Sequence, residues 1–179
     1  MKKPLFAVSL VILLCFTFSC QNKAKKAELE KMRTTAATVE QNKTIARQLH
    51  EALDSQNVNR LIELLAPGAV IHGAEPQEDV TAENAAQFLG PFYQAFPDLT
   101  HSIEDIIAEG DKVVARVLIQ ATHKGELEGI PPTGNRVKYY QITILQIVDG
   151  KIKEGWRITD TLGCLMQLGM ELKPREIKK

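Results

Sequence analysis

The sequence is poor in cysteine, and none of its three cysteines is expected to form an intramolecular disulfide. Cys15 lies in an N-terminal apolar segment, Cys20 directly follows it, and Cys164 stands alone in the rest of the chain. If Cys15 is removed with that segment and Cys20 carries a lipid, Cys164 has no partner within the chain. In that case no intramolecular disulfide is possible, even in an oxidising destination.

The sequence also lacks an excess of either charge. It has 22 basic and 22 acidic residues and no basic block, which argues against nucleic acid as a partner. Its 179 residues suit one domain, with room for a real core.

Several signatures of catalytic sites are missing. The four histidines lack metal-ligand spacing, and neither a His-Glu-x-x-His nor a Gly-x-Ser-x-Gly motif occurs. Gly125 and Gly129 bracket two glutamates, which is the wrong charge for cradling phosphate. We therefore expect no metal and no cofactor.

The one long apolar run is short for a membrane-spanning helix. Two lysines precede about 15 mostly apolar residues, from Pro4 to Phe18, whereas a spanning helix needs roughly 20. The run ends in Thr17-Phe18-Ser19-Cys20, which resembles a bacterial lipobox with Cys20 as the lipid-modified first residue. An ordinary cleaved signal and an uncleaved N-terminal anchor remain the alternatives.

The lipobox predicts a signal peptide over residues 1–19 and a polar, lipidated tether over 20–37. A lipid on Cys20 would attach the protein to the cell membrane or the outer membrane, with the domain facing the periplasm or the exterior. The domain itself is expected over 38–170, followed by a tail over 171–179.

Hydrophobic periodicity predicts helices first and strands afterwards. Helical spacing begins at Val39 and at Val58, and Thr81 is expected to N-cap a third helix. A brief strand is predicted over 69–72. Four longer strands are predicted after it: Leu99–Ala108, Lys112–His123, Arg136–Val148 and Lys151–Asp160. Asp149-Gly150 is typical of a type I′ hairpin turn. The pattern indicates an α+β domain in which a curved, mostly antiparallel sheet packs on three N-terminal helices.

Six short motifs resemble one known family. They are Phe96-Pro97-Asp98-Leu99, Ile106-Ile107-Ala108-Glu109-Gly110-Asp111, Thr122-His123-Lys124-Gly125, Gly129-Ile130-Pro131-Pro132-Thr133-Gly134, Asp149-Gly150-Lys151-Ile152 and Asp160-Thr161-Leu162-Gly163. Over about residues 40–170 the chain resembles the SnoaL-like polyketide (ester) cyclases of the nuclear-transport-factor-2-like superfamily. The resemblance implies a cone-shaped fold with a deep pocket, often dimeric through the convex sheet face. It also implies cofactor-free aldol ring closure with a cavity aspartate as acid/base, at the position of Asp160.

Strand alternation provides an independent argument about Asp160. Counting in twos along the last strand places Asp160 on the same face as Ile152, Trp156 and Ile158, which would turn its carboxylate toward the pocket. Counting outward from the hairpin turn sets Tyr139 opposite Asp160 and Gln141 opposite Ile158. Alternatively, Asp160 or Thr161 simply N-caps a short helix over 162–169.

Other side chains are weaker candidates for the same pocket. His123 could be a second polar group at its mouth, although strand-end histidines are more often solvated or bonded to a loop. His72 could line the cavity. The alternative is that it simply lies in a loop without a role in the pocket. Trp156 and Phe92 are expected to be core residues, and a place in the pocket wall is the second interpretation for both. Cys164, in an apolar segment, is expected to be an inert buried thiol.

Three functions remain open from the sequence. The first is cofactor-free proton transfer on a small hydrophobic carbonyl compound, with Asp160 as acid/base and Tyr139 or His123 polarising the substrate. The second is binding of a small apolar ligand without turnover, and the third is an envelope interaction module that uses the convex sheet face.

Overall fold

The computed structural model describes the backbone of residues 5–173 and the side chains of residues 23–173 apart from Pro76. The chain forms two compact units, Met1–Thr38 and Val39–Lys179. The expected lipidation of Cys20 and the whole expected signal peptide over residues 1–19 lie outside the residues whose side chains are described. Within the described part of the chain, no helix combines the length and apolar character needed to cross a membrane.

The second unit is an α+β fold, as expected. Its helices are the C-terminal part of α1 (Leu5–Asp54), α2 (Val58–Leu64), α3 (Ala85–Ala95) and α4 (Thr161–Gln167), with a 3-10 turn, η1 (Pro76–Glu78). Its strands are β1 (Leu65–His72), β2 (Thr100–Glu109), β3 (Lys112–Thr122), β4 (Arg136–Val148) and β5 (Lys151–Thr159).

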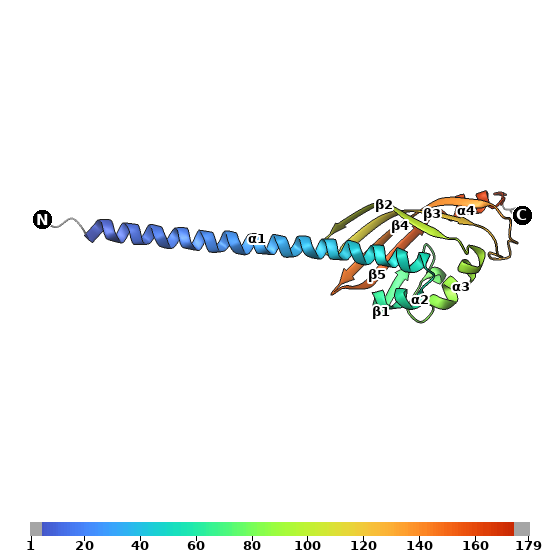
Figure 1. The fold of residues 1–179 in the computed structure, drawn as a ribbon, viewed down its shortest axis with the longest axis horizontal. Coiled ribbons are helices and arrows are strands. Elements are labelled where there is room, and N and C mark those ends of the chain that lie inside the picture. The colour runs from blue at the N-terminus through green and yellow to red at the C-terminus, as the bar shows by residue number, and fades with distance from the viewer. Residues whose placement is uncertain (1–4, 174–179) are drawn as a thin grey trace, which may run out of the picture. The chain divides into compact units, whose positions relative to one another are not determined.

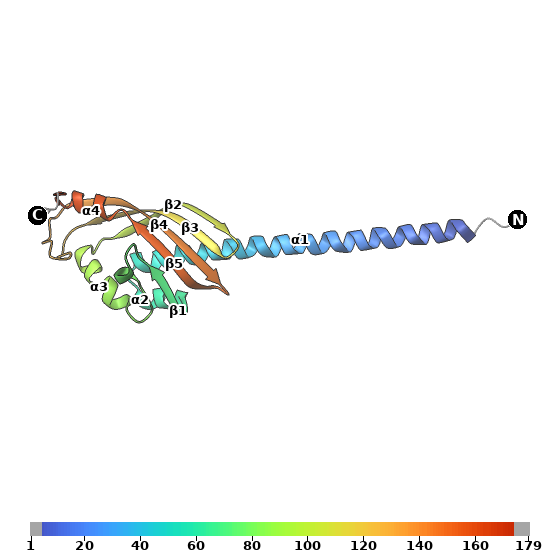
Figure 2. The ribbon, with the colours of Figure 1, turned by 180° about the vertical axis from the view of Figure 1, so that it is seen from behind.

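The five strands form one curved, unclosed sheet in the order β1-β5-β4-β3-β2 (Figure 1). Every neighbouring pair is antiparallel except β1 with β5, which is parallel. Figure 2 shows β1 beside β5 from behind. The expected curved, mostly antiparallel sheet is therefore confirmed.

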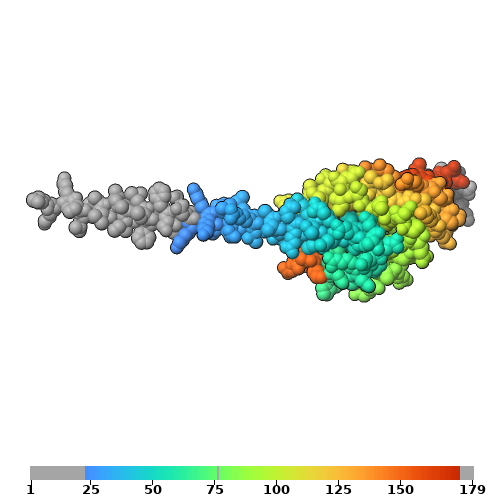
Figure 3. Space-filling view, viewed as in Figure 1, coloured from blue at the N-terminus to red at the C-terminus, as the bar shows by residue number. Residues whose placement is uncertain are grey.

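The core of this unit lies between the sheet and the helices. Helix residues Ala46 and Leu49 and strand residues Val113 and Val117 are buried in one cluster, as is Phe96 at the end of α3. In the space-filling view the helical segments, cyan to green, lie against the strands, yellow to orange (Figure 3). Burying this apolar surface is the main favourable contribution to folding.

The hairpin between β4 and β5 turns at Asp149-Gly150, as predicted. Both residues have positive φ, 50° and 75°, which a type I′ turn requires. Val148 pairs with Lys151 directly beside the turn, so the expected register begins correctly.

A bulge in β5 then changes the face of every later residue in that strand. Ile147 pairs with Ile152, but Gln146 pairs with Glu154, so β5 contains one extra residue between these two pairs. Because side chains alternate with a period of two, an extra residue moves the following ones to the opposite face. Ile158 is consequently 60% exposed instead of facing the pocket.

The bulge also corrects the predicted cross-strand pairs. Gln141 pairs with Thr159 rather than with Ile158, and the Asp160 N–H donates to the carbonyl of Tyr140 rather than meeting Tyr139.

The start of α3 also differs from the prediction. Asn84, not Thr81, is the N-cap residue. The Asn84 side chain instead accepts a hydrogen bond from the Thr81 N–H and donates one to the carbonyl of Asp79. Asn84 therefore orders the approach to the helix through turn contacts that periodicity does not reveal.

Candidate ligand pocket

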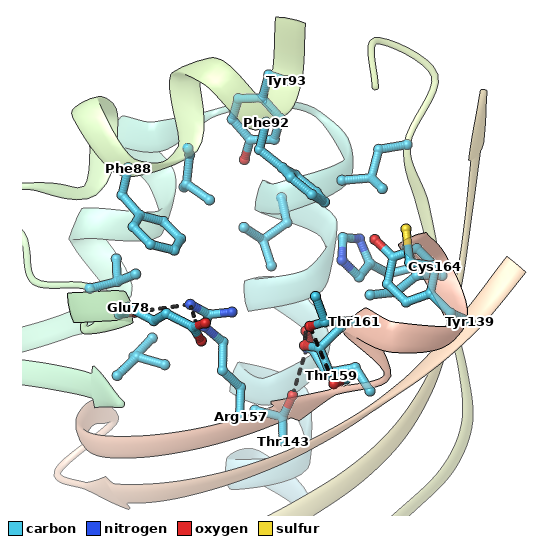
Figure 4. A pocket seen from close by; sticks show the side chains of 18 of the residues that line it. Glu78, Phe88, Phe92, Tyr93, Tyr139, Thr143, Arg157, Thr159, Thr161 and Cys164 are labelled. Atoms are coloured by element: carbon cyan, nitrogen blue, oxygen red, sulfur yellow. Dashed lines mark hydrogen bonds and ion pairs between the residues drawn. The ribbon is translucent and has the colours of Figure 1, made fainter. Parts of the chain in front are cut away.

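A pocket of about 260 Å³ lies between the helices and the concave face of the sheet (Figure 4). Much of its wall is apolar: Leu49, Leu53, Leu61, Ile71, Val80, Phe88, Leu89, Phe92, Leu99, Ile119, Leu127 and Leu165. Ligand pockets usually span 300–1,000 Å³, so this one suits a small ligand. An apolar wall with a few polar groups favours a mostly hydrophobic compound.

Three polar side chains form a connected row on the sheet side of the pocket. The Thr159 hydroxyl donates to Oε1 of Gln141 at 3.0 Å, and Nε2 of Gln141 donates to the Thr143 hydroxyl at 3.0 Å. All three line the pocket, and Gln141 and Thr143 are buried. Since the row is already hydrogen-bonded, it can present oriented dipoles to a ligand without rearranging.

Tyr139 lies on the same strand as Gln141 and also lines the pocket. Its ring is buried, and burial is the main reason that its pKa is raised from 10.0. The phenol therefore stays protonated at neutral pH and can act as a hydrogen-bond donor.

Arg157 supplies a cation to the same sheet side of the pocket, where it pairs with Thr143 of the neighbouring strand. One guanidinium nitrogen donates to the carbonyl of Glu78 at 2.9 Å and lies 3.8 Å from the Glu78 carboxylate. The guanidinium also sits 5.0 Å from the centre of the Phe88 ring. Burial is the main cause that lowers the Arg157 pKa, yet an arginine remains charged at neutral pH.

A further set of polar side chains lines the pocket from α1, α3 and β2. His50 and His101 line it with ring centroids 5.3 Å apart, and Tyr93 of α3 points its hydroxyl toward the interior (Figure 4). His101 is held by Asp54, whose Oδ1 lies 2.6 Å from its Nδ1 and accepts its backbone N–H at 2.8 Å.

Asp160 does not lie where strand alternation predicted. It is exposed, and its carboxylate accepts the Gly163 N–H at 2.9 Å, which makes Asp160 the N-cap of α4. The bulge in β5 is the reason, because it turns Arg157 and Thr159 toward the pocket instead. Asp160 nevertheless stands between two residues that line the pocket, Thr159 and Thr161.

The prediction that His123 sits at the pocket mouth is wrong. The residue is fully buried away from the pocket lining, 5.4 Å from the Phe96 ring. Its Nδ1 accepts the backbone N–H of Thr133 at 3.2 Å, and its backbone bonds Asn135 and Gly134. These contacts tie the proline-containing loop to the end of β3, which is a structural task.

The expected pocket positions of Trp156 and His72 are also wrong. His72 lies between Asp79 and Glu154, 3.0 and 3.2 Å from its two ring nitrogens, and these carboxylates raise its pKa. Trp156 packs beside His72 and under the Lys112 ammonium, on the face opposite to Arg157. The β5 bulge again explains the displacement of Trp156.

The structure places Tyr139, Gln141 and Phe92 in the pocket wall, where the sequence analysis expected them. Cys164 is a buried free thiol, as expected. Burial raises its pKa to about 11, which agrees with the prediction that it is inert. Among the described residues, no group of three or more His, Cys, Asp or Glu could hold a metal ion.

Three residues that line the pocket were not predicted from the sequence: Arg157, Thr159 and His50. Gly155 could have indicated the change of face in β5, since glycine inside a strand often marks a bulge or a close approach. A Cβ on Gly155 would lie 3.0 Å from the Leu145 side chain. His50 follows Leu49 in the first helix, but helical periodicity alone does not predict a pocket there.

The family profile described as SnoaL-like polyketide cyclase matches residues 43–168. The chain belongs to the SnoaL-like polyketide cyclase family, and the resemblance stated from its motifs is confirmed.

Two curated relatives carry cyclase names. Aklanonic acid methyl ester cyclase DnrD of Streptomyces peucetius is 36% identical over 110 residues, which cover 60% of this chain and 73% of that protein. Aklanonic acid methyl ester cyclase DauD of Streptomyces sp. (strain C5) is 37% identical over 111 residues, covering 61% and 66%. This chain therefore spans just under two thirds of the second relative.

The fold is similar to a crystal structure of IdmH, a candidate polyketide cyclase from Streptomyces antibioticus. The TM-score is 0.65 at 32% identity, and the match covers 72% of this chain and 99% of that one.

Proposed function

We propose that this chain is an envelope lipoprotein whose pocket binds a small, largely apolar carbonyl compound and catalyses cofactor-free proton transfer of the cyclase or isomerase type. The observation that carries the proposal is an apolar pocket of about 260 Å³ onto which Arg157, Tyr139 and a row of bonded hydroxyl and amide groups converge. The cyclase names of the two curated relatives support the reaction class.

The polar groups suit a reaction that passes through an enolate. Removing a proton from the carbon beside a carbonyl leaves its electron pair delocalised onto the carbonyl oxygen, which becomes negative. Fixed donors aimed at that oxygen stabilise the charge as it develops. The Tyr139 phenol and the Arg157 guanidinium are the two donors best suited to this role.

We keep Asp160 as the proposed acid/base, because it lies between two pocket-lining threonines at the rim. In the structure its carboxylate is occupied by the Gly163 N–H. That hydrogen bond uses only Oδ1, so Oδ2 is the oxygen that would take a proton from a substrate.

Replacing Asp160 by Asn and by Ala separates these two roles. Asparagine caps helices about as well as aspartate, so Asp160→Asn should leave the unfolding free energy nearly unchanged, whereas Asp160→Ala should cost about 0.5–2 kcal/mol. Both variants should lose about 10²–10⁴-fold in rate, because neither side chain accepts a proton. Urea unfolding and deuterium exchange beside the carbonyl of 2-acetonaphthone measure the two effects. Exchange by Asp160→Asn at the wild-type rate would remove Asp160 from the mechanism.

Binding without turnover is the second candidate function, and one observation favours it. The carboxylate at the family's acid/base position is exposed and engaged as a helix cap. The same exchange experiment separates the candidates: a wild-type protein that binds the ketone without accelerating exchange is a binding protein.

The lipid anchor has its own test. Cys20→Ser should move the protein from the membrane fraction to the soluble fraction in the organism that makes it, since a thioether-linked lipid requires the cysteine sulfur. Ser19→Thr, which keeps the cysteine, is the matched control. Continued tight membrane attachment of Cys20→Ser would contradict lipidation at this residue.

A homodimer through the outer sheet face remains part of the proposal. Ile142 of β4 pairs with Ile158 of β5, and both side chains are exposed there. Exposed, adjacent apolar side chains on one face suit an interface with a second copy.

A further inference from the structure

Three polar atoms at the α1 and α3 end of the pocket are buried without a hydrogen-bond partner among the described residues. They are both ring nitrogens of His50 and the hydroxyl oxygen of Tyr93. An unpaired buried polar atom destabilises the folded state, and buried polar groups are nearly always paired in folded proteins. Both residues line the pocket, so a molecule inside it could supply the missing partners.

The His50 ring packs against His101, which Asp54 holds in place. The two ring centroids lie 5.3 Å apart, and Asp54 holds His101 through both a ring nitrogen and the backbone N–H. His50 also borders an outer polar groove with Arg47 and Glu51, but its exposure is only 2%. Solvent therefore does not satisfy the ring from outside.

The chemistry of the pair favours a hydroxyl as the partner. Burial is the main cause that lowers the His50 pKa to about 4, followed by the nearby His101, with Asp54 acting in the opposite direction. The ring is thus neutral at pH 7, with one nitrogen that donates and one that accepts. Burial and the charge of Asp54 raise the Tyr93 pKa to about 12, so its phenol keeps its proton. A ligand hydroxyl can donate and accept, so it suits either tautomer of His50.

We propose that His50 and Tyr93 form a subsite for a hydroxyl group on an otherwise apolar ligand, with His101 and Asp54 as positioning residues. This inference rests on the proposed function in one respect, namely that the pocket holds a small apolar compound. The subsite would bind a polar group of the ligand from helices α1 and α3, which are distant in sequence from Asp160.

Two probes that differ in one hydroxyl test the subsite on the purified full chain. Calorimetric titration should show that 2-naphthol binds at least about 10-fold more tightly than naphthalene. In Tyr93→Phe, which removes only one oxygen atom, the ratio should fall severalfold, and in His50→Phe it should approach 1. The nitrogen resonances of the His50 ring should shift on addition of 2-naphthol and stay in place with naphthalene, a response that a purely structural histidine would not give.

Equal binding of both probes by the wild-type protein would overturn the subsite and leave the pocket proposal standing. An unchanged ratio in folded Tyr93→Phe and His50→Phe would also overturn it. Failure of the wild-type protein to bind either probe would overturn both the subsite and the proposed apolar pocket.

Discussion

Lowering the pH from 7 to 4 is expected to reduce the unfolding free energy of the wild-type protein by about 3 kcal/mol more than that of a His50→Phe variant. The cause is the buried imidazole of His50, whose pKa is lowered from 6.5 to about 4 in the folded protein. Between these two values the unfolded chain binds a proton that the folded protein excludes. Stability from this residue is therefore complete above pH 6.5 and is lost as the pH falls toward 4.

Urea unfolding at a series of pH values measures this difference directly. His72 titrates in both proteins, and its raised pKa has the opposite effect on stability, so its contribution cancels in the comparison. The His101–Asp54 pair faces His50 in the wild type and stays in the variant. If the unfolding free energies of the two proteins changed in parallel with pH, His50 would titrate equally in the folded and unfolded states. The end of the pocket that His50 lines would then contain water.

Filling the pocket from α4 is expected to weaken binding of 2-acetonaphthone by more than about 100-fold. Leu165 is half-buried and lines the pocket, so a Leu165→Trp side chain would occupy the space of a small ligand. Overpacking a shaped cavity costs about 1–3 kcal/mol or more, and each 1.4 kcal/mol corresponds to a tenfold change in affinity.

Met166 provides the matched control on the same helix. Its side chain is 58% exposed and lies outside the pocket lining, so Met166→Trp adds the same ring without entering the cavity. Calorimetric titration should show near wild-type affinity for Met166→Trp. Equal affinities for both tryptophan variants would place the ketone outside this pocket.

The sequence predicted the fold well because local signals agreed with the global arrangement. The Asp149-Gly150 turn, the limits of β4 and the change from helices to strands all follow from turn chemistry and periodicity. The sequence could not give the register of β5 beyond the turn. A single extra residue between Ile152 and Glu154 reversed the faces of Trp156, Arg157 and Ile158, and a bulge has no periodicity of its own.

The site was correspondingly predicted only in part. Tyr139 and Gln141 lie on β4, where alternation is undisturbed, and both reach the pocket. His123 was misplaced because a strand-end histidine can equally be enclosed by a later loop, here the one containing Thr133. His50 and Tyr93 line the same pocket from two helices distant in sequence, α1 and α3, which no local pattern encodes.

A small apolar compound is expected to occupy the pocket between the helices and the sheet. Native mass spectrometry of the wild-type protein and of Leu165→Trp, each incubated with 2-acetonaphthone, tests it most directly. The wild-type protein should form a one-to-one complex, and Leu165→Trp should remain bare. Equal occupancy of the two proteins, or bare protein in both, would contradict this expectation.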